Sequence, residues 1–352
     1  MPACITQANI YTKGDKKMAI MTLLDGAFSA IAGAISKIVA VIVSMMISAG
    51  SLATAPATDD LIKAADAENV QLMVEVVGDT QLNAFNKNYV YFDLAMQDYQ
   101  NAETDMDGLV IVGDVTENCL AMEWDKIGSI LADNAFDDTL ILATGNHDIR
   151  LRSMDDIKTK FYGLQNQFTV VEPAGELYYS YELNGYKFIV LGSDTSEMEE
   201  VNIGEAQLNW LDAEMSAATA DGKPVFVIIH QVLKDTHGLP LTWGNGTNKT
   251  AGTVGKDSDA IYAVLNKYEN VFFLTGHMHT GFGQYTYEIL GDNGNIVSVN
   301  LPGLGKNSQD GIEGFGQGAI MEVYEDQVIF RARDLSNGKY YGAEYDLTVD
   351  LK

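Results

Sequence analysis

The sequence feature that most constrains the fold is a series of apolar segments that end in polar residues. Three of these segments cover residues 71–78, 108–113 and 139–143, and two stretches of helical composition, 89–100 and 120–133, separate them. Alternating strands and helices at this spacing predict parallel βαβ units. Successive strand ends lie roughly 30 or more residues apart, which is the length of one such unit. Because parallel strands end at the same edge of a sheet, the polar residues that follow them are expected to meet there.

The second half of the chain predicts a second set of strands. Residues 178–183 and 186–191 flank Asn184-Gly185, a strong signal for a type I′ hairpin. The remaining expected elements are a helix at 204–217, a strand at 224–229, a glycine-rich loop at 231–256, a helix at 257–268, a strand at 271–275 and short strands within 285–351. No linker or internal repeat interrupts residues 61–352, so we expect them to form one domain.

Composition excludes several classes of protein. The chain has 352 residues, 47% of them hydrophobic, which is enough to bury a large core. Its formal net charge of −27 argues against stable nucleic-acid binding, which depends on Lys and Arg neutralising phosphates. A small phosphorylated substrate stays compatible with this charge where metal ions supply the local positive charge. Cys4 and Cys119 are the only cysteines, so no disulfide framework and no cysteine-based zinc site can form.

Residues 1–60 differ in composition from the rest of the chain. Residues 18–55 are rich in Ala, Ile, Val, Met, Ser and Gly, and residues 38–58 carry no charge. Three interpretations compete: a secretory signal, a membrane anchor, and an apolar helix that packs on the domain. The apolar run and the small residues at 51–55 favour export. We therefore expect a secreted or cell-envelope protein, anchored to the membrane through residues 18–55 if this segment is retained.

Candidate metal ligands follow five of the expected strands. A single Gly-Asp or a single histidine at a strand end is weak evidence, but four of the five histidines in the chain lie at such ends. The candidate ligands are Asp79, Gln81, Asp114, Asn146, His230, His277 and His279. Carboxylates, amide oxygens and imidazoles together suit manganese, iron or zinc, whereas calcium would be expected with oxygen ligands only. The number of ligands is sufficient for two ions, an arrangement suited to in-line displacement at phosphorus.

The order of these motifs resembles the calcineurin-like metallophosphoesterases, from Val74 to about Pro302. The resemblance lies in Gly-Asp79-Thr-Gln81, Gly-Asp114, Gly-Asn146-His147-Asp148, His230 and Gly-His277-Met-His279, with similar segments at 207–211 and 300–303. It implies an α/β fold, a four-layered α/β/β/α sandwich of two mixed β-sheets flanked by helices. It also implies two divalent or trivalent metal ions and hydrolysis of phosphate esters.

The resemblance implies a role for each metal ligand. It places Asp79, Asp114 and His279 on one ion, and Asp114 also reaches the second ion. Asn146, His230 and His277 complete the second ion. At Gln81 the family usually has histidine, and an amide oxygen is a neutral and weaker ligand than imidazole, so we expect the first ion to bind more loosely.

The resemblance also implies residues that act on the substrate, and the long loop suggests one more. A metal-bridging hydroxide would attack phosphorus, and Asn146 and His147 would contact the phosphate. His147 would also protonate the leaving oxygen. Asp148 is expected either to orient His147 or to be an ordinary turn carboxylate. His237, in the long loop, is expected along the substrate cleft, or alternatively on an exposed surface loop.

Three functions remain after this reasoning. The leading prediction is a metal-dependent phosphomonoesterase or phosphodiesterase that uses a bridging hydroxide. A narrower alternative is a cyclic-nucleotide or nucleotide phosphodiesterase. A different class is a catalytically weak, metal-stabilised envelope binding protein. The near-complete ligand set and the presence of His147 favour the enzyme.

Overall fold

The structure is a computed structural model that describes residues 60–83, 85–172, 175–197, 201–239 and 253–352. The segment Ala55–Lys352 forms one compact unit. The predicted export or anchor segment, residues 18–55, lies outside the described residues. None of the described helices is both long enough and apolar enough to span a bilayer.

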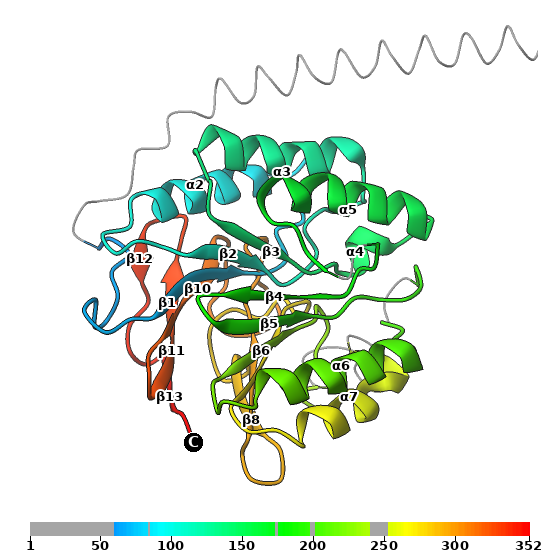
Figure 1. The fold of residues 1–352 in the computed structure, drawn as a ribbon. Coiled ribbons are helices and arrows are strands. Elements are labelled where there is room, and N and C mark those ends of the chain that lie inside the picture. Colours follow the sequence, from blue (N-terminus) through cyan, green and yellow to red (C-terminus); the bar gives the residue numbers. More distant parts are fainter. Residues whose placement is uncertain (1–59, 84, 173–174, 198–200, 240–252) are drawn as a thin grey trace, which may run out of the picture. The chain divides into compact units, whose positions relative to one another are not determined.

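The first of two mixed β-sheets contains the strands that precede the carboxylate motifs (Figure 1). Its strands are β1 (Leu72–Val77), β2 (Gly108–Ile111), β3 (Thr139–Leu142), β10 (Gln317–Val323), β11 (Gln327–Asp334), β12 (Lys339–Tyr340) and β13 (Leu347–Asp350). Their order is β12-β11-β10-β1-β2-β3, with β13 paired to β11. Strands β1, β2 and β3 are parallel, as the βαβ pattern predicts, and β10 runs antiparallel to β1.

The second sheet contains the strands that precede the histidine motifs. Its strands are β4 (Tyr179–Leu183), β5 (Tyr186–Val190), β6 (Val225–Ile228), β7 (Val271–Thr275), β8 (Tyr287–Leu290) and β9 (Ile296–Asn300). Their order is β4-β5-β6-β7-β9-β8, and β5, β6, β7 and β9 are parallel. The predicted hairpin is present between β4 and β5, with positive φ at both Asn184 (51°) and Gly185 (78°), as a type I′ turn requires.

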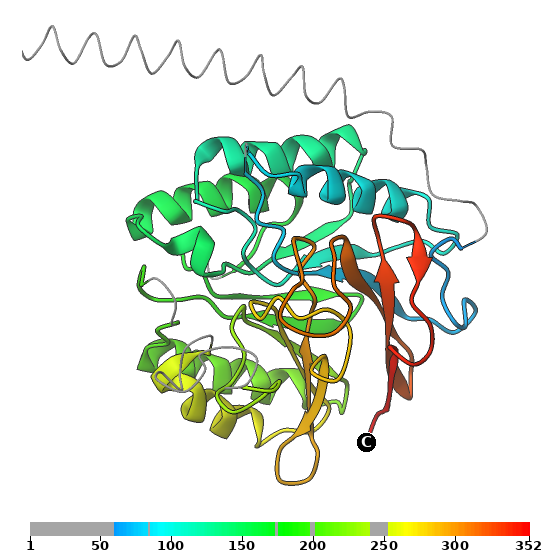
Figure 2. The same ribbon diagram turned by 180° about the vertical axis from the view of Figure 1, so that it is seen from behind.

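Helices cover the outer face of each sheet, as Figures 1 and 2 show. The first sheet is covered by α2 (Asn88–Gln100), α3 (Ala121–Asp133) and α5 (Met154–Phe168), and the second by α6 (Glu205–Ala218) and α7 (Ser258–Leu265), which follows η1 (Gly255–Asp257). The predicted four-layered α/β/β/α sandwich of two mixed sheets is therefore confirmed.

The core explains why the central strands are apolar along their whole length. With helices on one face and the other sheet on the opposite face, β1, β2, β6 and β7 are buried at every residue. Phe188, Phe226 and Phe272 stack across neighbouring strands of the second sheet, with ring centroids 4.9 and 5.4 Å apart. Phe272 also lies 6.0 Å from Phe330 on β11, so aromatic side chains join the two sheets.

Two elements differ from the sequence-based expectation. Residues 146–149, expected as a polar turn, form the short helix α4 (Asn146–Ile149). Helix α5 was not predicted, although Ser153 accepts a hydrogen bond from the Asp156 N–H and caps it. Its buried residues Ile157, Phe161 and Leu164 have helical spacing, and this signal was available in the sequence.

A buried acid within β1 gives a prediction about stability. Glu75 is fully buried, and neither carboxylate oxygen has a hydrogen-bond partner among the described residues. Burial, and then the charge of Asp98, raise the Glu75 pKa well above its ordinary value of 4.5, although Arg333 opposes them. The folded protein thus retains a proton that the unfolded chain releases, so the free energy of unfolding should fall as the pH rises above 4.5.

We expect Glu75→Gln to make this fall shallower by up to about 1.4 kcal/mol per pH unit, the effect of one proton. Urea unfolding at several pH values above 4.5 measures it. Glu68→Gln, at an exposed position, is the matched control and should leave the slope unchanged. An identical slope in wild type and Glu75→Gln would show that Glu75 ionises normally in the folded protein.

Candidate metal centre

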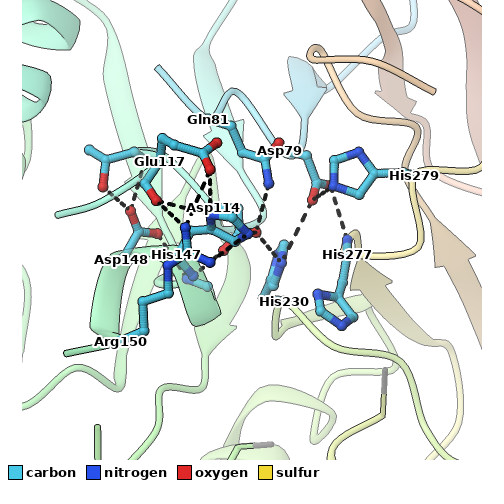
Figure 3. A network of polar contacts seen from close by, with 12 residues as sticks. Asp79, Gln81, Asp114, Glu117, His147, Asp148, Arg150, His230, His277 and His279 are labelled. Atoms are coloured by element: carbon cyan, nitrogen blue, oxygen red, sulfur yellow. Dashed lines mark hydrogen bonds and ion pairs between the residues drawn. The ribbon is translucent and has the colours of Figure 1, made fainter. Parts of the chain in front are cut away.

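Six of the seven predicted metal ligands, all except Asn146, are seen to meet at the carboxyl ends of strands from both sheets (Figure 3). The first sheet contributes Asp79 and Gln81 after β1, Asp114 after β2 and Asn146 after β3, and the second contributes His230 after β6 and His277 and His279 after β7. Metal-ligating residue types from distant parts of the sequence are therefore gathered at one point, at the edge where α/β sheets place their ligands.

Three residues form the most compact part of this group. The ligand atoms of Asp114, His230 and His277 all lie within 4.8 Å of one another, and all three residues are buried. His230 Nε2 lies 3.2 Å from Asp114 Oδ2 and 3.7 Å from Asp79 Oδ1. His279 Nε2 lies 3.5 Å from the same Asp79 oxygen. Asp79 and Asp114 therefore both lie among imidazoles, as ligands of neighbouring ions would.

Backbone carbonyls orient two of the imidazoles. His230 Nδ1 lies 3.0 Å from the Val112 carbonyl, and His279 Nδ1 lies 2.9 Å from the Lys306 carbonyl. These bonds require Nδ1–H as the donor, which leaves Nε2 of each ring directed at the carboxylates. A metal-ligating histidine usually has its second nitrogen fixed in this way.

The charge and hydrogen bonding of the site fit a metal ion. Asp79 Oδ1 and His230 Nε2 are buried and have no hydrogen-bond partner among the described residues, an arrangement that is costly without a bound group. Burial lowers the pKa of His230, but the carboxylates of Asp114 and Asp79 outweigh burial and raise it to about 9. The site therefore attracts a positive charge, which a divalent cation supplies in place of a proton.

The backbone at the ligands is unusual. Five of the seven predicted ligands have positive φ, between 41° and 71°: Asp79, Gln81, Asp114, His277 and His279. Non-glycine residues in this region cost on the order of 1–3 kcal/mol each, and such residues cluster at functional sites. This left-handed backbone is a feature of the site that sequence reasoning did not identify.

The glycines before the ligands are required by close packing. A Cβ at Gly145 would lie 2.1 Å from Asp114 Oδ1, and a Cβ at Gly113 would lie 2.7 Å from the His230 ring. Gly113 also has a φ of 104°. Glycine thus lets the chain pass directly against the carboxylate and the imidazole of neighbouring loops.

Gln81 lies where the resemblance implies histidine. The Gln81 side-chain Nε2 donates to Asp114 Oδ2 at 3.3 Å. The Gln81 backbone carbonyl accepts a hydrogen bond from the Asn86 side-chain amide at 2.9 Å. The side chain therefore reaches the carboxylate expected to bridge the ions. Rotation of the amide by 180° would place its oxygen there instead. Either orientation provides a neutral group at this position.

His147 lies beside the predicted bridging carboxylate. Its backbone N–H donates to Asp114 Oδ1 at 2.8 Å, and its Nε2 lies 3.9 Å from Asp114 Oδ2. On the other side of the ring, Nδ1 lies 2.9 Å from the Glu117 carbonyl and 3.3 Å from Glu117 Oε1. Burial lowers the His147 pKa, but the Glu117 side chain and the Asp114 charge raise it to about 9. The ring is thus fixed with Nε2 directed toward the metal ligands.

Of the two roles expected for Asp148, the structure shows that of a turn carboxylate. Its two oxygens accept hydrogen bonds from the backbone N–H groups of Val115, Thr116 and Gly145, at 2.8 to 3.0 Å, and from the Thr116 hydroxyl. These bonds join the loop after β2 to the start of α4. The carboxylate that contacts His147 belongs to Glu117, so the prediction that Asp148 orients this ring is wrong.

Sequence reasoning missed Glu117 and Arg150. Arg150 Nη2 donates to the Glu117 carbonyl at 2.8 Å and lies 3.3 Å from Glu117 Oε1, while its Nη1 lies 3.4 Å from His147 Nε2. Glu117 lies in the loop after β2, where spacing gives no signal. Arg150 follows His147 by three residues, at the end of α4. On a helix, this spacing places two side chains on the same face.

Of the two expectations for His237, the exposed surface loop is wrong. The residue is 2% exposed and so does not lie on an exposed loop, while its place along the substrate cleft stays a prediction. Its ring nitrogens lie 2.8 Å from the Tyr285 carbonyl and 2.7 Å from Ser298 Oγ, and its N–H donates to Glu288. His237 therefore attaches its loop to β8 and β9. Much of that loop, residues 240–252, lies outside the described residues.

No protein-family model matches the chain, and no curated protein sequence matches it. Solved structures do match, three of them at 13–14% identity with TM-scores above 0.5. A dimetal phosphatase from Danio rerio aligns over 81% of this chain and 100% of its own, with a TM-score of 0.58 and 14% identity. A purple acid phosphatase from yellow lupin seeds aligns over 79% of this chain but only 53% of its own (TM-score 0.55, 14% identity). The anchor in the inner membrane complex of Plasmodium aligns over 80% and 89% (TM-score 0.54, 13% identity).

Proposed function

We propose that this chain, which has the fold of the calcineurin-like metallophosphoesterases, hydrolyses phosphate esters at a centre of two metal ions. One observation carries the proposal: the buried Asp114 carboxylate lies 3.2 Å from Nε2 of His230, an imidazole oriented to bind a metal ion. The same carboxylate also accepts a hydrogen bond from the backbone N–H of His147. The group best placed to bridge two ions therefore lies next to a residue able to transfer a proton. A site that only bound metal would not need a residue that transfers a proton.

The ligands divide into two sets that share Asp114. In the proposal, Asp79, Gln81 and His279 hold one ion with Asp114, while Asn146, His230 and His277 hold the other. Manganese, iron or zinc suits this mixture of oxygen and nitrogen ligands. When bound, the ions supply Lewis-acid stabilisation of the phosphoryl charge and a water of lowered pKa.

The residues of the chain would orient the substrate and move the proton. In the proposal, His147 contacts the phosphate through Nε2 and protonates the leaving oxygen. Glu117 holds the opposite nitrogen, so the ring presents Nε2 to the substrate in every turnover. Asn146, on the same helical turn, contacts the phosphate from the metal side. Asp148 acts indirectly, because it fixes the two loops from which these residues project.

A second candidate is a metal-stabilised binding protein without significant turnover. Two observations favour it: one structural neighbour is described as an anchor, and Gln81 offers a neutral ligand where the family usually has histidine. A loosely held first ion would leave a stable but inactive centre.

Metal analysis combined with two chromogenic esters tests the proposal. We expect protein loaded with manganese, iron or zinc to retain two ions and to hydrolyse p-nitrophenyl phosphate, bis(p-nitrophenyl) phosphate or both. Metal saturation should also stabilise the fold, by about 2.7 kcal/mol at a free metal concentration 100 times Kd. Chelated protein is the control. Tightly held metal with no turnover of either ester would support the binding protein, and failure to retain any metal would overturn both functions.

A further inference from the structure

We propose that Arg150 binds the phosphoryl group of the substrate beside His147 and so favours phosphomonoesters over phosphodiesters. This inference rests on the proposed function and adds a substrate class to it. The observation behind it is that the Arg150 guanidinium and the His147 ring converge next to the metal ligands, with Arg150 Nη1 3.4 Å from His147 Nε2.

The position of Arg150 is set by α4 and by Glu117. Arg150 ends α4, three residues after His147, and its N–H donates to the Asn146 carbonyl at 3.0 Å. The hydrogen bonds to Glu117 use Nη2, so Nη1 is the nitrogen that faces His147 Nε2, at 3.4 Å. The Arg150 side chain is 20% exposed and that of His147 is 18% exposed. Both side chains are therefore held in place and accessible to a small molecule.

The two groups lie close enough for one phosphoryl oxygen beside His147 Nε2 to reach Arg150 Nη1 as well. A general acid carries its proton on the nitrogen that faces the leaving oxygen, which here is His147 Nε2. Arg150 is charged at any relevant pH and has donors only. As the two residues lie, Arg150 Nη1 can donate to His147 Nε2, and a phosphoryl oxygen that enters beside Nε2 can accept from Nη1 in its place. Hydrogen bonds from a guanidinium to a phosphate oxygen are stronger than those between neutral groups, because both partners are charged.

This position distinguishes the two classes of ester. A phosphomonoester near neutral pH has three unesterified oxygens and a charge close to −2, whereas a diester has two such oxygens and a charge of −1. A cation beside the leaving group stabilises the doubly charged group more. In a diester, the second esterified oxygen carries an organic substituent and no negative charge. Arg150 should therefore contribute mainly to monoester binding and turnover.

Glu117 has a supporting role in this arrangement. Its Oε1 lies 3.3 Å from both Arg150 Nη2 and His147 Nδ1, so one carboxylate holds both donors. It lies on the Nδ1 side of the ring, away from Nε2. The carboxylate positions the two groups and leaves Arg150 Nη1 and His147 Nε2 for the substrate.

Arg150→Ala, assayed with both nitrophenyl esters in metal-loaded protein, tests the inference. For the monoester, we expect kcat/KM to fall about 10–100-fold, the range for one hydrogen bond to a charged group. The loss with the diester should be less than about threefold. Arg150→Lys should recover part of the monoester loss, since it keeps the charge but not the planar fork. Arg152→Ala is the matched control: this arginine is on the same loop and donates to the Asn118 carbonyl instead.

Inorganic phosphate provides a readout that does not depend on turnover. Phosphate should raise the melting temperature of wild type and Arg152→Ala, and raise that of Arg150→Ala much less. An equal loss with both esters, or unchanged stabilisation of Arg150→Ala by phosphate, would overturn the role of Arg150. A wild type that binds phosphate but hydrolyses neither ester would count against the proposed function instead.

Discussion

Asp114→Asn is expected to reduce turnover of either nitrophenyl ester to the level of the chelated protein. Asp114 is the single residue that belongs to both proposed ligand sets, and its two oxygens have different neighbours: Oδ1 accepts the His147 N–H, and Oδ2 faces His230. Asparagine has nearly the same shape but one oxygen and no charge. The loss should therefore exceed the roughly 10–100-fold that removal of an outer-shell partner costs in metalloproteins.

The measurements for Asp114→Asn are kcat/KM and metal content, made on the same preparation. We expect fewer than two retained ions along with the loss of turnover. Asp105→Asn, at an exposed aspartate that belongs to neither proposed ligand set, is the matched control and should behave as wild type. Wild-type activity in Asp114→Asn, at full metal content, would show that the ligand assignment is wrong.

His147→Ala is expected to have the second-largest effect. A positioned general acid contributes about 10²–10⁴-fold, so kcat for a substrate with a poor leaving group, such as an alkyl phosphate, should fall by this factor. p-Nitrophenyl phosphate needs less protonation because nitrophenolate is stable as an anion, and its loss should be at least about tenfold smaller. Comparison of kcat for the two substrates in wild type and variant gives the result.

The leaving-group comparison separates proton transfer from a structural effect. A His147→Ala variant that lost its metal or its fold would lose activity toward both substrates equally. Equal losses would therefore contradict the assignment of His147 as the acid. Glu117→Gln supplies an intermediate case, since it keeps the carbonyl bond to Nδ1 but removes the charge. It should show the same dependence on leaving group, with a smaller loss.

The architecture was predictable because local and tertiary signals agree. The apolar runs at β1, β2, β3, β6 and β7 are buried on both faces, and the Asn-Gly turn fixes the hairpin between β4 and β5. Polar residues after these strands then had to meet at one edge. Helix α5 was missed because its signal, the Ser153 cap and the spacing of its apolar residues, lies in a stretch without a motif.

The details of the site were less predictable because they depend on contacts between loops. Asp148 is adjacent to His147 in sequence, but the start of α4 directs its carboxylate to the backbone of the neighbouring loop. Glu117, from that loop, contacts the ring instead. His237 is buried against β8 and β9, and no pattern around it in the sequence indicates those partners. The metal-ligand assignments and the export segment stay predictions.

The chain completes its first sheet only after it has formed the second, and this order has a consequence for synthesis of the protein. Strand β10, residues 317–323, pairs with one edge of β1, whose other edge pairs with β2, and the last proposed ligand is His279. A chain growing from its N-terminus therefore displays Asp79, Asp114 and Asn146 long before the histidines exist. Even after His279 emerges, β1 lacks its β10 partner and presents an unpaired edge. The proposed site would thus be complete only late in translation, and until then the nascent chain presents an edge that is open to aggregation.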